Sequence, residues 1–313
     1  MKTALVALPG QALLGWRRFT QKRKLHQEGI QTARIACDGL SLQVYANQPP
    51  AGSNQKIVQI WQAHPPAGPL VFLHGFLDSS LTFRSLLPAI ARAHPVLAID
   101  IPGFGGSYLP AIRELWQIDA MARTISRLLF ETLALQRVQL VAHSMGAVLA
   151  AHVYRWQQIR YPGGRITGMH WLAPGVFRLA AKEQDALASF FYPRDATGLQ
   201  HLLSSLSYKE RPPLPGFIKL ALLREWSGPG LQMLKANTLE RERSIFFERE
   251  QLQRLRVPVD LYWGRQDQIT PLSLGRKIHK AIPESRLHII EAAGHTLHLD
   301  QRTALLNTLL PRL

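Results

Sequence analysis

Residues 138–151 read Val-Gln-Leu-Val-Ala-His-Ser-Met-Gly-Ala-Val-Leu-Ala-Ala, and this stretch decides the fold. An apolar run of strand length ends at His143, and a segment of helical composition begins directly after Ser144. Because no loop separates the two, Ser144 is predicted to lie on a sharp strand-to-helix turn. Such a turn crowds the backbone two residues before and after the serine, where this sequence has Ala142 and Gly146.

This turn predicts a nucleophilic serine. The hydroxyl of Ser144 would stand above the carboxyl end of a sheet, and the amide of Met145, at the helix N-terminus, would donate to an oxyanion. A buried serine in an ordinary strand-helix connection is the alternative. Five residues do not decide between the two, so features elsewhere in the chain are needed.

The chain around this turn alternates strands and helices. Strands are expected at 33–37, 40–45, 57–61, 70–73, 96–100, 168–172, 257–263 and 286–290, and helices at 83–92, 115–133, 145–158, 272–281 and 303–310. Such alternation predicts an α/β fold with a mostly parallel sheet and helices on both faces. Ligands are then expected at the carboxyl ends of the strands.

The alternation stops at 173–175 (Ala-Pro-Gly) and resumes at 257–263. Residues 176–250 are therefore predicted to form a helical cap or lid over the site, inserted into a core made of 29–175 and 251–313. The cap carries aromatic residues that either line an acyl pocket or form the cap's own small core. Phe191 and Phe217 are the candidates for the pocket.

Two further residues supply the groups that a serine nucleophile needs. Asp267 follows the strand expected at 257–263, and His295 follows the strand expected at 286–290. Taken singly, these are an ordinary turn aspartate and an ordinary loop histidine. Their order, Ser144 then Asp267 then His295, with each at a strand end, predicts a base and a group that orients it.

The segment His74-Gly75-Phe76-Leu77 follows the strand at 70–73. Gly75 allows a tight turn, so that the Phe76 amide is expected to point toward the same place as the Met145 amide and complete a two-donor oxyanion hole. Leu77 and His143 are candidate pocket residues beside these groups, although a packing role for His143 is equally open. His74 is expected to bond to nearby loop backbone.

These segments together resemble the α/β-hydrolase superfamily over residues 30–313. The resemblance rests on His74-Gly75-Phe76, Asp100-Ile101-Pro102-Gly103-Phe104-Gly105, residues 142–146, Gly264-Arg265-Gln266-Asp267 and Gly294-His295. It implies an eight-stranded sheet with an inserted cap. Residues 208–215 are similar to the monoacylglycerol-lipase-like and carboxylesterase branch, whose members cleave short glycerides and simple esters, often at membranes through an N-terminal anchor.

Residues 1–28 differ in composition from the rest of the chain. A mostly apolar stretch, 4–16, precedes five basic residues, Arg17, Arg18, Lys22, Arg23 and Lys24. The stretch is too short to span a bilayer, and its charge follows it, unlike that of a secretory signal. Either this arm lies on an anionic membrane surface or it is loosely docked; Pro9 and Gly10 argue against a clean amphipathic helix.

The composition limits the partners. The chain has 313 residues, 46% of them apolar, one cysteine (Cys37) and a net charge of +16. That charge favours an anionic membrane surface or an acidic acyl carrier protein, since no nucleic-acid-binding motif accompanies it. We expect no cofactor and no metal, and a cytoplasmic location, either free or peripheral at the inner face of the membrane.

Three functions remain open from the sequence. The first is a serine hydrolase that cleaves a small carboxylic ester through Ser144, His295 and Asp267. The second uses the same residues on esters or thioesters of an acyl carrier or of coenzyme A, which the positive charge would attract. The third is a noncatalytic binding protein on the same fold.

Overall fold

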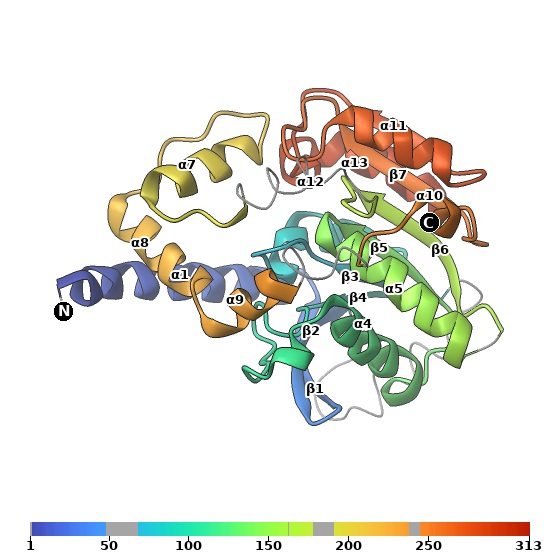
Figure 1. The fold of residues 1–313 in the computed structure, drawn as a ribbon, viewed down its shortest axis with the longest axis horizontal. Helices are drawn as coiled ribbons and strands as arrows, with labels where there is room; N and C mark the ends of the chain where they lie inside the picture. The colour runs from blue at the N-terminus through green and yellow to red at the C-terminus, as the bar shows by residue number, and fades with distance from the viewer. Residues whose placement is uncertain (1, 48–67, 162, 178–190, 238–244) are drawn as a thin grey trace.

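The structure, a computed structural model, describes residues 2–47, 68–161, 163–177, 191–237 and 245–313, with side chains from residue 9 onward. Within these residues eight strands form one sheet in the order β1-β2-β4-β3-β5-β6-β7-β8 (Figure 1). The strands are β1 (Ile30–Cys37), β2 (Leu40–Asn47), β3 (Leu70–Leu73), β4 (Val96–Ile99), β5 (Val138–His143), β6 (Ile166–Leu172), β7 (Val259–Gly264) and β8 (Arg286–Ile290). The strand expected at 57–61 lies outside the described residues.

Strand pairing is antiparallel at one edge of the sheet and parallel elsewhere. β1 and β2 form a hairpin whose turn residues, Asp38 and Gly39, have φ angles of 53° and 72°, as a tight hairpin turn requires. β2 also pairs antiparallel with β4, and the pairings from β4 through β3, β5, β6 and β7 to β8 are parallel. The predicted mostly parallel, eight-stranded sheet is confirmed.

Helices cover both faces of the sheet (Figure 1). α4, α5 and α11 pack on one face in a core that includes Val71 and Leu73, while α3 and α13 pack on the other with Leu70 and Phe72. β3 contributes to both cores because successive strand residues point to opposite faces. The helical segments of this part are η1 (Ser80–Ser85), α3 (Leu87–Ile90), η2 (Arg113–Leu115), α4 (Ile118–Arg127), η3 (Leu128–Thr132), α5 (Met145–Arg160), α10 (Arg249–Leu252), α11 (Leu272–Ala281), α12 (Leu297–Asp300), α13 (Arg302–Leu309) and η6 (Leu310–Arg312).

Two of the expected helices are divided. The segment expected at 83–92 forms η1 and then α3, where Pro88 stands in the first turn, the position at which its missing N–H costs least. The segment expected at 115–133 is helical from Ile118 and ends in a π-helical turn, η3. The strands and helices that carry the predicted site residues begin and end within a few residues of their expected positions.

Between β6 and β7 the chain leaves the sheet and forms α7 (Ala196–Ser205), α8 (Gly216–Trp226) and α9 (Pro229–Lys235). The two ends of this insertion meet, since the Phe247 N–H donates to the Val176 carbonyl at 2.8 Å and Phe177 bridges Phe247. These helices lie to one side of the sheet, beside α1 (Figure 1). They are the segment that the sequence suggests as a cap.

The N-terminal arm differs from expectation, because Lys2–Gln27 form one helix, α1, that runs through Pro9. α1 packs against α8 of the insertion, and Arg18 forms an ion pair with Glu225 at 2.5 Å. Gly10 has no side chain and permits this close approach, so packing overrides the local cost of proline. No helix among the described residues is both long and apolar enough to cross a membrane.

Candidate active site

Ser144 lies between β5 and α5 in a conformation that few residues adopt. Its φ is 52° and its ψ is −116°, which is the strained turn that the sequence predicts for a serine of this kind. The turn is held because the Ser144 N–H donates to the Leu172 carbonyl at 3.0 Å. A side chain at Gly146 would collide with the carbonyl oxygens of Leu73 and His74, so only glycine fits there.

Three predicted side chains form one hydrogen-bonded chain. Ser144 Oγ lies 2.9 Å from His295 Nε2, and His295 Nδ1 lies 2.9 Å from Asp267 Oδ2. A carboxylate only accepts, so His295 carries its proton on Nδ1 and its Nε2 accepts from the serine hydroxyl. All three residues are buried. The arrangement can take a proton from Ser144 and hold the imidazole in one orientation.

The Asp267 carboxylate is fixed by its own loop. Oδ1 accepts the N–H groups of Ile269 and Thr270 at 2.8 and 2.9 Å, and Oδ2 accepts the Thr270 hydroxyl at 2.8 Å. Thr270 Oγ1 is also 3.2 Å from His295 Nδ1. Thr270 is not among the residues predicted from the sequence, although its spacing from Asp267 is that of an aspartate accepting from the residues that follow it.

A second missed residue is Asp300, which joins the insertion to the His295 loop. Its Oδ2 accepts the N–H groups of Gly294 and Tyr208 at 2.9 and 2.8 Å, and its Oδ1 accepts the Ser207 hydroxyl. Asp300 is buried. No local pattern marks this residue, because two of its three partners, Ser207 and Tyr208, lie about 90 positions earlier in the chain and are brought to it only by the fold.

Two more histidines pack beside His295. His143 donates from Nε2 to the His295 carbonyl at 3.0 Å, and its ring lies 4.9 Å from the His295 ring and 4.7 Å from that of His298. Burial and the neighbouring His298 and His295 lower the pKa of His143 well below its usual value. His143 therefore stays neutral and supports the His295 backbone, which is the packing role that the sequence left open.

The two predicted oxyanion donors belong to segments that adjoin Ser144. Met145 is the first residue of α5, where N–H groups have no partner within the helix, and Phe76 follows Gly75 on the loop after β3. Gly75 comes so close that a β-carbon there would lie 3.3 Å from the Ser144 β-carbon. His74, as expected, bonds to loop backbone, with Nδ1 2.8 Å from the Gly75 carbonyl and Nε2 accepting from the Ile101 N–H at 3.0 Å.

A cavity of about 500 Å³ opens above Ser144. Of the pocket candidates, Leu77, His143 and Phe191 line it, whereas Phe217 is not among the described residues that do. Phe217 lies on α8, and the same helix turns Ile218 toward the cavity instead. The sequence did not suggest that α1 contributes to this wall, but the lining includes Leu13, Leu14, Trp16 and Arg17.

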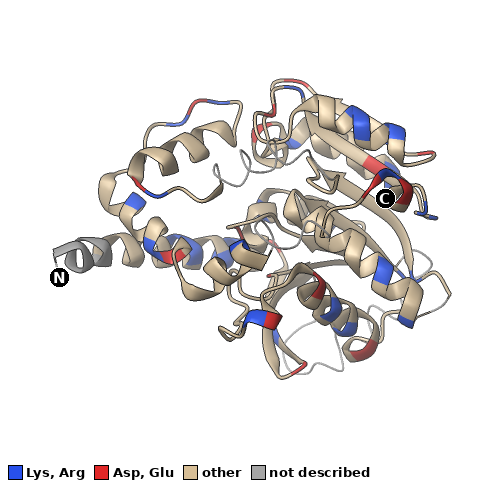
Figure 2. Ribbon diagram, viewed as in Figure 1, with Lys and Arg blue, Asp and Glu red and all other residues tan. Residues whose placement is uncertain are grey.

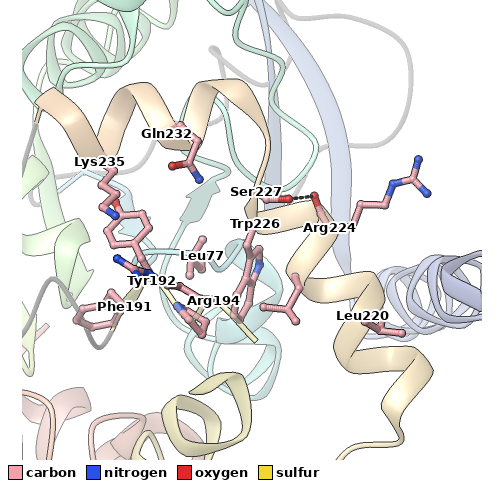
Figure 3. A pocket seen from close by; sticks show the side chains of 12 residues that line it. Leu77, Phe191, Tyr192, Arg194, Leu220, Arg224, Trp226, Ser227, Gln232 and Lys235 are labelled. Carbon is pink, nitrogen blue, oxygen red and sulfur yellow. Dashed lines mark hydrogen bonds between the residues drawn. The ribbon is translucent and has the colours of Figure 1, made fainter. Parts of the chain in front are cut away.

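A neighbouring cavity of about 630 Å³ extends into the insertion (Figure 3). Leu77 and Trp226 line both cavities and so stand between them. Phe191 and Tyr192 form one side, and the Lys235 ammonium lies 4.9 Å from the centre of the Tyr192 ring. The Phe76 ring packs edge-on against Phe191 at 5.8 Å, which connects the oxyanion loop to this wall.

In the described part of the chain, no group of three or more His, Cys, Asp or Glu side chains is arranged to hold a metal ion. The polar groups near Ser144 instead contact one another and loop backbone.

Comparison with known proteins places these observations in a family. A family model for the alpha/beta hydrolase fold matches residues 68–301. The chain is 25% identical to the uncharacterized hydrolase YugF of Bacillus subtilis (72% of this chain, 82% of YugF) and 21% identical to the monoacylglycerol lipase ABHD6 of Bos taurus (74% and 71%). A membrane phospholipase A, described as a bacterial virulence factor, superposes with a TM-score of 0.73 at 19% identity (99% and 93%). The family model covers most of the chain and agrees with the sheet and the Ser144 turn, so the chain belongs to the alpha/beta hydrolase family.

Proposed function

We propose that this protein is a serine hydrolase that cleaves carboxylic esters. The single observation that carries the proposal is the buried hydrogen-bonded chain from Ser144 Oγ through His295 to Asp267. A buried serine without a function would not need a histidine at 2.9 Å that is itself oriented by a carboxylate. The strained backbone of Ser144 further supports a functional role, since strain of this kind is retained at active sites.

The mechanism follows from these positions. His295 Nε2 takes the hydroxyl proton as Ser144 Oγ attacks the ester carbonyl carbon, and the N–H groups of Phe76 and Met145 donate to the resulting oxyanion. His295 then protonates the leaving alcohol. Water, deprotonated by the same nitrogen, adds to the acyl-enzyme and releases the acid. Asp267 keeps the imidazole in the required tautomer throughout.

The surroundings favour an ester with an apolar acyl group. The cavity above Ser144 is lined mainly by leucine, isoleucine, tryptophan and phenylalanine side chains. An acyl chain buried there contributes about 0.8 kcal/mol for each CH₂ group. Relatives named as a monoacylglycerol lipase and as a membrane phospholipase A act on substrates of this general class.

Hydrolysis of p-nitrophenyl esters from acetate to palmitate would test the proposal. Ser144→Ala should lower kcat by at least about 10³-fold while the fold, followed by circular dichroism, is unchanged. Ser273→Ala, at an exposed position of α11, is the matched control and should retain full activity. Activity that survives in Ser144→Ala would reject the mechanism.

The alternatives give different results in the same experiment. A wild type that is inert toward every ester but is labelled at Ser144 by a fluorophosphonate would favour an acyl-carrier or coenzyme A ester or thioester as the substrate. A wild type that is neither active nor labelled would favour a noncatalytic binding protein.

We further propose that α1 brings the enzyme to an anionic membrane surface. Trp16 and Phe19 are each 63% exposed on this helix, and the neighbouring Arg17, Arg18 and Arg23 are exposed as well. Figure 2 shows basic residues along α1. Interfacial helices combine these two features. Because α1 also lines the cavity above Ser144, a lipid-borne ester would be released next to the nucleophile.

A further inference from the structure

A third cavity, of about 480 Å³, adjoins the one above Ser144. Leu77 and Trp226 line both, and so do Arg17 and Arg211. The two cavities differ in character, since the one above Ser144 is lined mostly by apolar side chains and the third mostly by polar and charged ones. Two arginines therefore stand at the boundary between an apolar chamber, which contains the nucleophile, and a polar one.

Arginines from three distant parts of the chain line the third cavity, the polar chamber. Arg17 comes from α1, Arg84 from η1 and Arg211 from the segment before α8. Arg84 donates to the Leu81 carbonyl at 3.1 Å and Arg211 to the Ser207 hydroxyl at 3.0 Å. Among the described residues, none of the three lies within ion-pair distance of a carboxylate.

Two of the three carboxylates that line this chamber are engaged elsewhere. Asp100 accepts the N–H groups of Ser80 and Gly106, both at 2.7 Å, and Glu225 pairs with Arg18. Asp78 is half-buried and interacts electrostatically with Arg84, while burial raises the pKa of its carboxyl. Three carboxylates stand against five basic residues in the lining, so the positive charge of this chamber is incompletely balanced; the five are Arg17, Arg18, Lys22, Arg84 and Arg211.

The arginines are also close to one another and to the nucleophile's surroundings. Burial and then Arg17 lower the pKa of Arg84, with Arg211 adding to the effect, as expected for guanidinium groups within electrostatic range. The charges of Arg84 and Arg211 also help to lower the pKa of His298, after burial and His295. The His298 ring contacts that of His143, which lies beside His295. The cluster therefore lies within electrostatic range of the histidines that pack beside His295.

We propose that Arg17, Arg84 and Arg211 form a subsite for a phosphate group on the alcohol side of the ester substrate. The inference rests on the proposed esterase function and narrows its substrate to an acyl ester of a phosphorylated alcohol. The acyl chain occupies the apolar chamber, the ester carbonyl lies at Ser144, and the phosphate lies in the polar chamber. Guanidinium groups suit this ligand because their N–H pairs match two phosphate oxygens. Water is added across the ester bond, and the phosphate leaves unchanged on the alcohol.

Binding of non-hydrolysable analogues tests the subsite without depending on catalysis. 1-O-octylglycerol 3-phosphate and 1-O-octylglycerol differ only in the phosphate, and isothermal titration calorimetry gives the ratio of their Kd values. We expect the wild type to bind the phosphate analogue at least about 10-fold more tightly, and Arg84→Gln or Arg211→Gln to reduce this ratio about 10-fold. Arg84→Lys, which keeps the positive charge, should retain part of the wild-type ratio that Arg84→Gln loses.

Arg276→Gln is the matched control, because Arg276 is exposed on α11 and lines neither cavity. This variant should keep the wild-type ratio. Equal binding of the two analogues by the wild type, or an equal loss of preference in Arg276→Gln, would overturn the proposal. Inorganic phosphate that binds as tightly as the octyl phosphate would also overturn it, because the site would then serve free phosphate and not a substrate.

Hydrolysis of 1-octanoylglycerol 3-phosphate and 1-octanoylglycerol separates the two proposals. Ser144-dependent cleavage of both esters at equal kcat/KM would contradict the subsite and leave the esterase function standing. A phosphate preference in binding, with no cleavage of either ester, would support the subsite and contradict the esterase function.

Discussion

Gly10 of α1 and Phe217 of α8 meet backbone to backbone. A β-carbon at Gly10 would collide with the Phe217 carbonyl oxygen and would lie 2.8 Å from the Ala221 β-carbon. The N-terminal helix is therefore seated against the insertion at a point where only glycine fits. Three residues further along the same helix, Leu13 begins the stretch that lines the cavity above Ser144, although its position in the sequence is about 130 residues from Ser144.

Gly10→Ala should separate the two helices, because backbone atoms cannot rotate away as a side chain does. We expect a loss of about 1–3 kcal/mol in the free energy of unfolding, measured with urea, and a raised KM for long-chain esters. Gly15→Ala is the matched control, since nothing lies within 4 Å of a β-carbon there. That variant should gain up to about 1 kcal/mol from helix propensity. Equal effects of the two substitutions would show that α1 does not pack in this way.

Thr270→Val should reduce catalysis more than binding. The substitution removes the hydroxyl that donates to Asp267 Oδ2 and leaves the side-chain shape nearly unchanged. Losing one hydrogen bond to a buried carboxylate predicts a decrease of about 10-fold in kcat for p-nitrophenyl butyrate, with a smaller change in KM. Thr270→Ser should recover most of the activity because it keeps the donor. Wild-type kcat in Thr270→Val would contradict this positioning role.

Asp267→Asn tests the tautomer of His295. An amide can donate to His295 Nδ1, which would leave the proton on Nε2 and remove the acceptor for the Ser144 hydroxyl. By analogy with other serine hydrolases, kcat should fall about 10⁴-fold at neutral pH while the Ser144 site stays folded. Stopped-flow measurement of p-nitrophenol release checks this, and a loss below about 10-fold would remove Asp267 from the mechanism.

Stability should decrease as the pH falls below about 6.5. Burial lowers the pKa of His170 to about 4, and burial with His295, Arg84 and Arg211 lowers that of His298 to about 3. Below pH 6.5 the unfolded chain binds protons at these histidines and the folded protein does not. Each of these two histidines therefore makes its full contribution to the free energy of unfolding above pH 6.5. That contribution declines by up to about 1.4 kcal/mol per pH unit toward pH 4.

His170→Gln isolates one of these contributions. The wild-type ring lies 2.9 Å from Gln139 Oε1, a bond that the new amide can keep by donating. Urea unfolding at pH values from 4 to 8 should show a shallower decline for the variant than for the wild type. Parallel curves would contradict a buried, neutral His170.

Membrane attachment through α1 predicts that Trp16→Ser with Phe19→Ser weakens binding to vesicles. These residues are 63% exposed, and removing two aromatic side chains from an interface should lower the partition coefficient by at least about 10-fold on phosphatidylglycerol vesicles. Ile159→Ser, at a position 70% exposed on α5, is the control and should bind like the wild type. Cosedimentation measures both. If all three proteins bind neutral and anionic vesicles equally, α1 is not the membrane contact.

The strand ends were predictable because their chemistry is local. The apolar run before Ser144, the small residues two positions on either side, and the loops with Asp267 and His295 are each visible in a few consecutive residues. Parallel strands then bring their carboxyl ends to one edge, which explains why three separate loops converge. The geometry at Ser144 follows from these rules without any long-range information.

The wall of the pocket was not predictable in the same way. Phe217 has the residue type of a pocket side chain, but the rotation of α8 presents Ile218 to the cavity. The helix through Pro9 and the contacts of Asp300 depend on partners many positions away. Local propensity cannot report such contacts, because their free energy comes from packing between segments that are far apart in the sequence.

The seating of α1 on α8 has a consequence for synthesis. α1 leaves the ribosome before α8, which begins at Gly216, about 200 residues later. At elongation rates of about 5–20 residues per second, roughly 10–40 s pass between the synthesis of α1 and that of α8. During that interval the apolar residues of α1 need another surface, either a chaperone or a bilayer. The nascent chain therefore has time to reach a membrane before the cavity above Ser144 acquires its last wall.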